Sequence, residues 1–403
     1  MNSIGKCIGC TMLVMGTLIG GGVLALPMVG IGSGFFALAA LLGMMWLLML
    51  VTGFLFLEVN VSLPPGENSF PSMARKTLGR SGQVATFVSY LLLLYALLAA
   101  YISGGSSLLS QLFSLRGISL SPHWGALLFA GLLGSCVFHG IKAVDLVNRC
   151  FFSAKAFFLV ASLALLTPCM NPMSSLIHHG NGWYAIAAAP IFLSSFGYHI
   201  LIPTIAKYLD RNVTTIRRVL IAGTSLTLLI YAYWLFELLG LIPQEQFSAF
   251  LQAQGSTGEL ISLITSQANN RWAGVVINGF ANITITTSFL GVSMGLFDFL
   301  ADALKKTAVA ADRKLLMLLT FVPPTLFALF YPKGFILALE YAAVFVAFSH
   351  VMLPAMMVWK VRALQPGSSY RVRGGRGLLV VVFLAGAVLV IIPMAASLVP
   401  RLG

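Results

Sequence analysis

Residues 16–27 read GTLIGGGVLALP, and this stretch decides how the chain folds. It lies inside an apolar run, over about residues 9–30, that is long enough to cross a bilayer. Three consecutive glycines, followed five residues later by Pro27, disfavour a continuous helix, because each glycine costs ~1 kcal/mol against alanine and proline has no N–H donor. In hydrocarbon, such a break survives only where protein or a polar cavity surrounds the freed backbone groups.

An interrupted helix of this kind exposes N–H groups on one side and carbonyl groups on the other. Together they suit a small zwitterion, whose carboxylate binds the N–H groups and whose ammonium binds the carbonyls. The alternative is an intact helix that packs closely on its neighbours through the small residues Gly16 and Gly20. The interrupted helix is favoured once its counterpart further along the chain is considered.

The composition is that of a polytopic membrane protein. Of 403 residues, 59% are hydrophobic and only 9% are charged, and the mean hydropathy is +0.94, whereas a soluble domain carries about a quarter charged residues. Eleven apolar runs of bilayer length predict an all-α protein with eleven transmembrane helices. They fall at about 9–30, 34–60, 84–113, 122–141, 150–168, 183–206, 216–242, 272–298, 315–331, 335–359 and 377–399. The first run has no small-residue cleavage pattern after it, so we expect a retained span.

The basic residues predict the orientation of the chain. Twenty of the 24 Lys and Arg residues fall in one alternate set of loops, and the opposite set holds only Arg116, Arg271, Lys333 and Arg401. Because basic loops stay in the cytoplasm, we expect a cytoplasmic N-terminus and, after eleven spans, a periplasmic C-terminus. The net charge of +13 therefore indicates membrane topology and not nucleic-acid binding. The longest loop, 243–271, is expected outside, where it could cap a vestibule.

A second interruption lies five spans after the first. The run 189–203 reads APIFLSSFGYHILIP, with small polar residues and a glycine at mid-span and Pro203 six residues after Gly197. Spans that are five apart cross the membrane in opposite directions, and matched interruptions in two such halves are typical of the central site of a transporter. We therefore expect one transmembrane domain over 1–403, with inverted repeats at about 9–168 and 183–359 and an extra helix at about 377–399.

Ionisable and hydroxyl groups inside the spans are the candidates for ion coupling, because burying them in a membrane is costly. Lys155 either snorkels to the inner surface or points into the bundle and titrates. Thr287 and Ser288 belong to a hydroxyl cluster that either bonds its own helix or coordinates an ion. His199, beside the second interruption, either has a structural role or carries a proton. Aromatic residues could close over a substrate ring or simply pack: Tyr90, Tyr95, Tyr101, Phe196 and Tyr198.

The sequence gives little indication of ATP-driven transport, metal binding, a channel or an enzyme. No GxxxxGK[ST] loop indicates ATP-driven transport, so no cofactor is expected and the proton motive force would supply the energy. The five cysteines lie mostly in apolar segments, and the adjacent His178 and His179 lack further ligands, so no metal site is expected. A channel would need a repeated polar lining. A membrane enzyme would need clustered Asp, Glu, His or Cys at one depth, and no catalytic residues are expected.

Seven motifs run in order along nearly the whole chain. They are GTLIGGGVLALP (16–27), YALLAAYISGG (95–105), NRCFFSAK (148–155), SSFGYHILIPTI (194–205), TTSFLGVSMGLFDFLAD (286–302), FALFYPKGF (327–335) and SSYRVRGGRGLLVVVF (368–383). By these motifs the chain resembles the hydroxy/aromatic amino acid permeases, most closely their tyrosine-specific members.

The resemblance implies the five-plus-five inverted-repeat fold of the amino acid–polyamine–organocation transporters, a LeuT-like fold, and proton symport across the bacterial inner membrane. It implies that Gly20, Gly21 and Gly22 receive the substrate carboxylate, and that carbonyls near Thr17, Ser194 and Ser195 receive the ammonium. It implies that Lys155 occupies the place of a sodium ion, where sodium-coupled relatives use hydroxyls at the positions of Thr287 and Ser288. Tyr198 stands where the SFGFH pattern has phenylalanine, which bears on how a substrate phenol is received.

We therefore predict an importer of aromatic amino acids, foremost tyrosine, that works by proton symport with alternating access. Substrate contacts are expected at Thr17, Gly20, Gly21, Gly22, Tyr95, Ser194, Ser195, Phe196, Gly197 and Tyr198. The alternatives are a tryptophan-preferring, a serine/threonine-type or a sodium-coupled permease of the same fold. The expected partners are the amino acid, the proton and membrane lipid, with no nucleic acid and no obligate protein partner.

Overall fold

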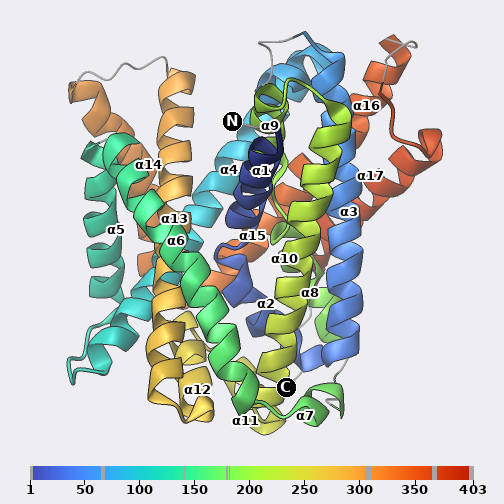
Figure 1. Cartoon of the computed structure of the whole chain (residues 1–403). Coiled ribbons are helices and arrows are strands. Elements are labelled where there is room, and N and C mark those ends of the chain that lie inside the picture. Colours follow the sequence, from blue (N-terminus) through green and yellow to red (C-terminus); the bar gives the residue numbers. More distant parts are fainter. Residues whose placement is uncertain are drawn as a thin grey trace.

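The computed structural model describes residues 3–64, 69–139, 141–177, 180, 182–304, 310–364 and 370–398, which form helices and the turns that join them (Figure 1). Within these ranges there is no β-strand. Of the features named above, His178, His179 and Arg401 lie outside the described residues. So do residues 368–369 and 399 and the side chains of residues 148–150 and 152.

The first half of the chain forms the following helices: α1 (Ser3–Leu18), α2 (Gly22–Gly30), η1 (Ile31–Ser33), α3 (Phe35–Ser62), α4 (Phe70–Ser114), α5 (Pro122–His139), α6 (Ile141–Leu166), η2 (Thr167–Cys169) and α7 (Pro172–Ile177). The second half continues with α8 (Gly182–Ser194), η3 (His199–Leu201), α9 (Ile202–Tyr208), α10 (Val213–Leu241), α11 (Gln244–Gln252), α12 (Thr257–Ala268), α13 (Arg271–Leu304), α14 (Ala310–Phe330), α15 (Phe335–Val346), η4 (Ala347–Met352), α16 (Leu353–Leu364) and α17 (Gly375–Leu398).

Many of these helices can cross a membrane. Within the described residues, eight are long and apolar enough, and nine if α1 and α2, which bend by 47° at their junction, count as one span. Two more apolar helices, Pro122–Phe138 and Ser153–Cys169, coincide with predicted spans but are shorter. The protein is thus an all-helical membrane protein, while the count of eleven spans and the inverted repeat stay predictions.

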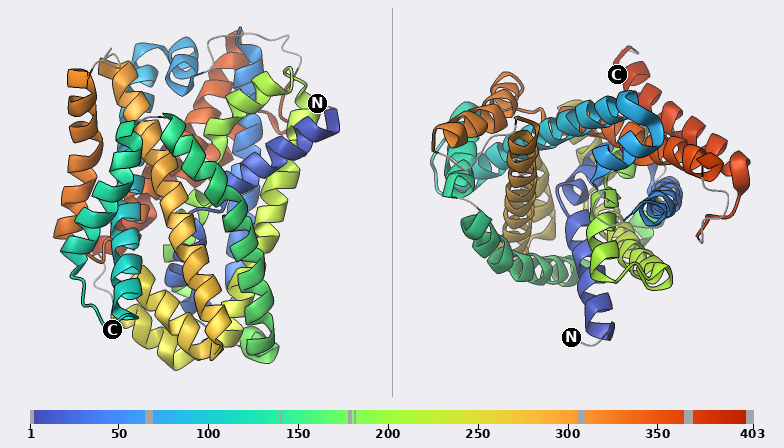
Figure 2. Two further views of the ribbon diagram at one scale, coloured as in Figure 1. Left: turned by 60° about the vertical axis from the view of Figure 1, so that its left-hand side comes forward. Right: turned by 90° about the horizontal axis from the view of Figure 1, so that it is seen from above.

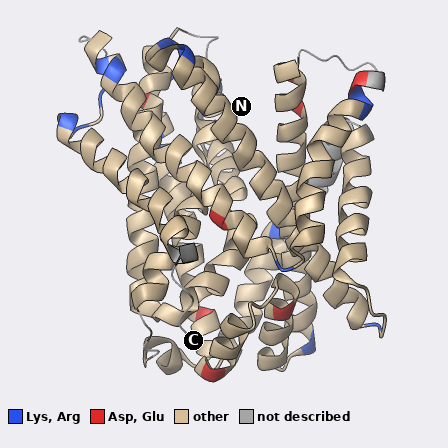
Figure 3. Ribbon diagram, turned by 180° about the vertical axis from the view of Figure 1, so that it is seen from behind, with Lys and Arg blue, Asp and Glu red and all other residues tan. Residues whose placement is uncertain are grey.

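The helices stand roughly alongside one another, and the α1–α2 segment runs from the edge of the bundle into its interior (Figure 2). Charged residues are sparse along the middle of the helices and gather toward the two ends of the bundle (Figure 3). This distribution follows from the cost of placing charge in hydrocarbon.

The segment 243–271, expected as the longest loop, forms the helices α11 and α12. A capping box begins α12, in which the Ser256 hydroxyl accepts the Glu259 N–H and the Glu259 carboxylate accepts the Ser256 N–H. The Thr257 hydroxyl then donates to the Gly104 carbonyl of α4 at 2.9 Å. The capping box and this contact with α4 stabilise a helix in a segment whose polar composition is typical of a loop.

Candidate functional site

The first interruption separates α1, which ends at Leu18, from α2, which begins at Gly22. The Gly20 N–H turns back to the Leu18 carbonyl at 2.7 Å, which ends the helical pattern. In the described part of the chain, the N–H groups of Gly21 and Gly22 donate no hydrogen bond and the Thr17 carbonyl accepts none. The break therefore presents free donors and a free acceptor, the two kinds of backbone group that a zwitterion requires.

Glycine is needed here because three side chains press against the backbone. A Cβ added at Gly21 would lie 2.6 Å from Cε1 of Tyr101 in α4, and one at Gly22 would lie 2.7 Å from Oγ of Ser195. At Gly20 the distance to Oγ of Ser288, from α13, would be 2.9 Å. These distances are far shorter than an ordinary carbon contact of about 3.5–4.0 Å, so only glycine allows so close an approach.

The second interruption follows α8. Residues 195–198 leave the helix, η3 makes one 3₁₀ turn, and α9 resumes at Ile202. Ser194 and Ser195 both donate their hydroxyls to the Ile191 carbonyl at 2.9 Å. Of their own backbone carbonyls, that of Ser194 accepts the Gly197 N–H at 3.1 Å, and that of Ser195 lies at the break, 3.4 Å from the Tyr231 hydroxyl. Within the described residues, the N–H groups of Tyr198 and His199 donate no hydrogen bond.

Helix α10 holds the two interruptions together. The Tyr231 hydroxyl donates to the Leu18 carbonyl at the end of α1 and lies 3.4 Å from the Ser195 carbonyl. One turn further, the Trp234 indole donates to the Val23 carbonyl at 3.0 Å. Pro27 has no N–H for that carbonyl, so Trp234 satisfies a group that the proline leaves open. The Tyr231 hydroxyl thus lies on both breaks, while Trp234 fixes α2 to α10.

Lys155 reaches the first break from α6. Its side chain is buried, with 7% of its surface exposed, and its ammonium donates to the carbonyls of Gly16 and Ile19 at 3.0 and 2.9 Å. No acidic side chain within the described residues forms an ion pair with it. The ammonium therefore lies inside the bundle against the open end of α1 and does not snorkel to the surface. Whether Lys155 couples ions stays a prediction.

Other predicted residues lie further from the breaks or point elsewhere. The Tyr95 hydroxyl donates to the Leu319 carbonyl of α14, and the Tyr198 hydroxyl donates to the Met49 carbonyl of α3. Thr287 donates to the Thr284 carbonyl of its own helix.

Three other predicted residues, Thr17, Phe196 and Gly197, lie at the breaks. The Thr17 side chain is exposed and bonds the Leu13 carbonyl, so its free backbone carbonyl is the group at the break. The ring of Phe196 packs edge-on against Tyr231 with centroids 5.5 Å apart. An added Cβ at Gly197 would lie 3.1 Å from the Ser194 carbonyl, so this glycine also marks a close backbone approach.

Sequence reasoning did not single out Tyr231 or Trp234. Their spacing of three residues places both on one face of α10, and a tyrosine and a tryptophan are the aromatic residues that seek a hydrogen-bond acceptor when buried. That spacing is a weak signal, because aromatic residues are common in membrane helices.

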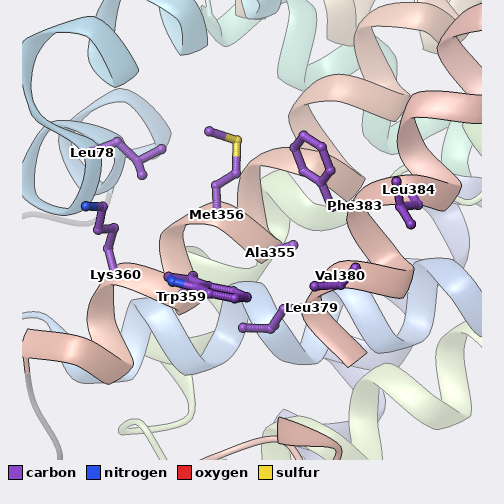
Figure 4. A pocket seen from close by; sticks show the side chains of 9 residues that line it. All are labelled: Leu78, Ala355, Met356, Trp359, Lys360, Leu379, Val380, Phe383 and Leu384. Atoms are coloured by element: carbon purple, nitrogen blue, oxygen red, sulfur yellow. The ribbon is translucent and has the colours of Figure 1, made fainter. Parts of the chain in front are cut away.

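A separate cavity of about 330 Å³ lies between α16 and α17 (Figure 4). Its lining is apolar apart from Lys360, and Trp359 lies beside that lysine. None of its lining residues belongs to either interruption, so this cavity is distinct from the candidate site.

Known transport proteins match this chain along nearly its whole length. Residues 3–393 match the tryptophan/tyrosine permease family. The chain belongs to this family. It is 36% identical to tyrosine-specific transport system 2 of Haemophilus influenzae, over 96% of both chains, and 36% identical to tyrosine-specific transport system 1 of the same organism, over 97% of both. It is also 33% identical to a tryptophan-specific transport protein of Pseudomonas aeruginosa, over 97% of this chain and 95% of that protein.

Membership of the tryptophan/tyrosine permease family confirms the predicted family and identifies the chain as a transport protein and not an enzyme. Together with the helices long enough to cross a bilayer, it identifies a bacterial membrane protein. The individual site residues stay predictions.

Proposed function

We propose that this permease imports aromatic amino acids, foremost tyrosine, by proton symport with alternating access around the two interruptions. One observation carries the proposal. Two interrupted segments meet through the Tyr231 hydroxyl, in a chain 36% identical to two tyrosine-specific transport systems along nearly its whole length.

The backbone groups at the first break support this use. The substrate carboxylate binds the N–H groups of Gly21 and Gly22, with Gly20 beside them. The ammonium binds the Thr17 carbonyl and the carbonyls of Ser194 and Ser195. Aromatic side chains around the breaks, Tyr101 and Phe196, close over the substrate ring. Uncharged backbone groups suffice because the substrate carries no net charge.

The coupling ion is a proton. The ammonium of Lys155 lies on two carbonyls at the end of α1, where a sodium ion would otherwise bind, and this position supports proton coupling. No cofactor takes part. The fold is an eleven-span bundle with five-plus-five inverted repeats in the bacterial inner membrane, with the N-terminus in the cytoplasm and the C-terminus in the periplasm.

The test is uptake of radiolabelled tyrosine into proteoliposomes that hold the purified full-length chain, with competition by tryptophan, phenylalanine and serine. We expect saturable uptake that tyrosine and at least one other aromatic amino acid block, while serine does not. Uptake that serine blocks as well as tyrosine does would overturn the substrate class.

Tryptophan is the second candidate substrate, because tryptophan-specific relatives match with 33% identity over almost the same residues. The same competition separates the two. If unlabelled tryptophan blocks uptake at a concentration well below that of unlabelled tyrosine, tryptophan is the preferred substrate.

A further inference from the structure

Two buried histidines meet directly behind the second interruption. His199 begins the 3₁₀ turn η3, and His350 lies in η4, a stretch of π-helix over Ala347–Met352. Their ring centroids are 4.8 Å apart with the planes at 73°, and the exposed fractions of the side chains are 0% and 4%. A π-helical turn weakens the regular backbone pattern and often marks a functional site. Here the π-helical turn places the imidazole of His350 against His199 at the second interruption.

The surroundings of His199 favour the tautomer with the hydrogen on Nε2, because the other tautomer would bury an N–H on Nδ1 with no acceptor among the described residues. The single hydroxyl hydrogen of Thr52 has the Met49 carbonyl as its acceptor at 3.1 Å. The Thr52 oxygen, 2.9 Å from Nε2 of His199, then accepts the Nε2–H. Nδ1 of His199 therefore keeps its lone pair, and this buried atom has no hydrogen-bond partner among the described residues.

His350 has a corresponding hydroxyl neighbour in Ser349. The Ser349 hydroxyl donates to the Phe345 carbonyl at 2.6 Å, so its oxygen accepts the Nδ1–H of His350 at 2.7 Å. The lone pair of His350 then lies on Nε2. The neutral pair thus carries two lone pairs, while each N–H is used by a neighbouring hydroxyl.

In the described segments, no acidic side chain forms a hydrogen bond or ion pair with either imidazole. Phe56 of α3 and Phe70 of α4 pack edge-on against the rings. Among the described residues, the titratable side chain in ring contact with the pair is Tyr198, whose centroid lies 5.0 Å from that of His199.

The nearest acid along α3 is already engaged. Glu58, two residues after Phe56, accepts two hydrogen bonds from Arg362 at 2.7 and 2.8 Å and one from the Val372 N–H. A positive charge on the histidine pair would therefore have no negative partner within the part of the chain that the structure describes. Two such charges would repel each other across the short distance between the rings, so the pair has a capacity of one proton.

We propose that His199 and His350 together form the binding site of the transported proton, with one proton for the pair. This inference rests on the proposed proton symport. The proton enters from the outer solution, adds to the lone pair of one imidazole without breaking either bond to Thr52 or Ser349, and leaves to the cytoplasm. The charged pair needs water or an anionic group beside it, and the unwound residues 195–198 are the segment whose opening admits one. Proton occupancy and the conformation of the break are thereby linked.

The experiment compares two transport modes in proteoliposomes. Exchange of labelled for unlabelled tyrosine at equal pH needs no net proton movement, whereas accumulation under an inward pH gradient does. The variants are His199→Gln, whose amide can still donate to Thr52, and His350→Asn, whose amide can still donate to Ser349. His123→Gln is the matched control, because His123 lies exposed in the first turn of α5.

We expect wild type and His123→Gln to accumulate tyrosine about tenfold per pH unit of gradient and per proton, with acidification of a pH dye inside the vesicles. Both pair variants should exchange tyrosine but reach an accumulation ratio of about one, without acidification. Full accumulation in either variant overturns the proposal. If both variants lose exchange as well as accumulation, the proposal is also overturned, because the pair is then needed for substrate binding or for folding. If wild type itself shows no gradient-driven uptake, the proposed proton symport fails instead.

Discussion

Replacing Gly22 by alanine tests the contact between the two interruptions. The added Cβ would lie 2.7 Å from Oγ and 3.1 Å from Cβ of Ser195. Forcing a methyl group into such a site costs about 1–3 kcal/mol, which corresponds to a loss of tyrosine affinity between about fivefold and 150-fold. To relieve this contact the backbone of residue 22 must shift, and with it the N–H group that is one of the two donors proposed for the substrate carboxylate.

The assay is equilibrium binding of labelled tyrosine to the purified protein, with thermal unfolding measured in parallel. Gly43→Ala is the matched control, because a Cβ at Gly43 of α3 meets no atom within 4 Å. Its affinity should stay within about twofold of wild type, and alanine should be neutral or slightly stabilising in the helix.

A double variant makes the test specific. Ser195→Gly removes the two atoms that the new methyl group meets most closely, so Gly22→Ala combined with Ser195→Gly should recover most of the lost affinity relative to Ser195→Gly alone. If Gly22→Ala behaves like Gly43→Ala, the contact with Ser195 does not constrain the binding site. The same conclusion follows if the double variant shows no coupling between the two positions.

Three further predictions follow from the same geometry. Lys155→Ala removes two charge-assisted hydrogen bonds of about 1.5–3 kcal/mol each and should lower both tyrosine exchange and gradient-driven uptake at least tenfold. Lys155→Arg should also lower both transport modes, because its guanidinium is too large for the same two carbonyls. Tyr231→Phe loses a hydroxyl bond of about 1 kcal/mol and should raise the KM for tyrosine roughly fivefold with little change in unfolding temperature. Glu58→Gln breaks the ion pair with Arg362, in which Glu58 is fully buried, and should lower the unfolding midpoint by roughly 5 °C or more.

Each of these has a contradicting result. Full accumulation by Lys155→Ala would exclude the ammonium from the transport cycle. A KM for Tyr231→Phe equal to that of wild type would mean that its bonds do not hold the breaks in the binding geometry. An unchanged unfolding midpoint for Glu58→Gln would mean that the ion pair does not hold α3 to α16.

The end of α1 could be located in the sequence because its cause is local, whereas two broken helices in an inverted repeat stay a prediction. Glycine at 20, 21 and 22 lowers helix stability wherever the segment lies, and α1 ends at Leu18 and α2 begins at Gly22. Hydropathy likewise predicted an all-helical membrane protein, and the motif order predicted the family that the comparisons confirmed.

The partners of the interruptions could not be located in this way, because they depend on how each helix is rotated about its axis. Tyr95 and Tyr198 were predicted to face the substrate, yet their hydroxyls bond the backbones of α14 and α3. Tyr231 and His350 drew no attention in the sequence, yet one bridges the two breaks and the other lies against the second. Apolar patterning is too uniform in a membrane helix to indicate which face meets which neighbour.

The most direct test of proton symport is the accumulation of labelled tyrosine by proteoliposomes in sodium-free buffer under an imposed inward pH gradient. Proton symport predicts an internal concentration that rises above the external one and collapses when the gradient is dissipated. Uptake that only equilibrates, or that requires sodium and ignores pH, would contradict it.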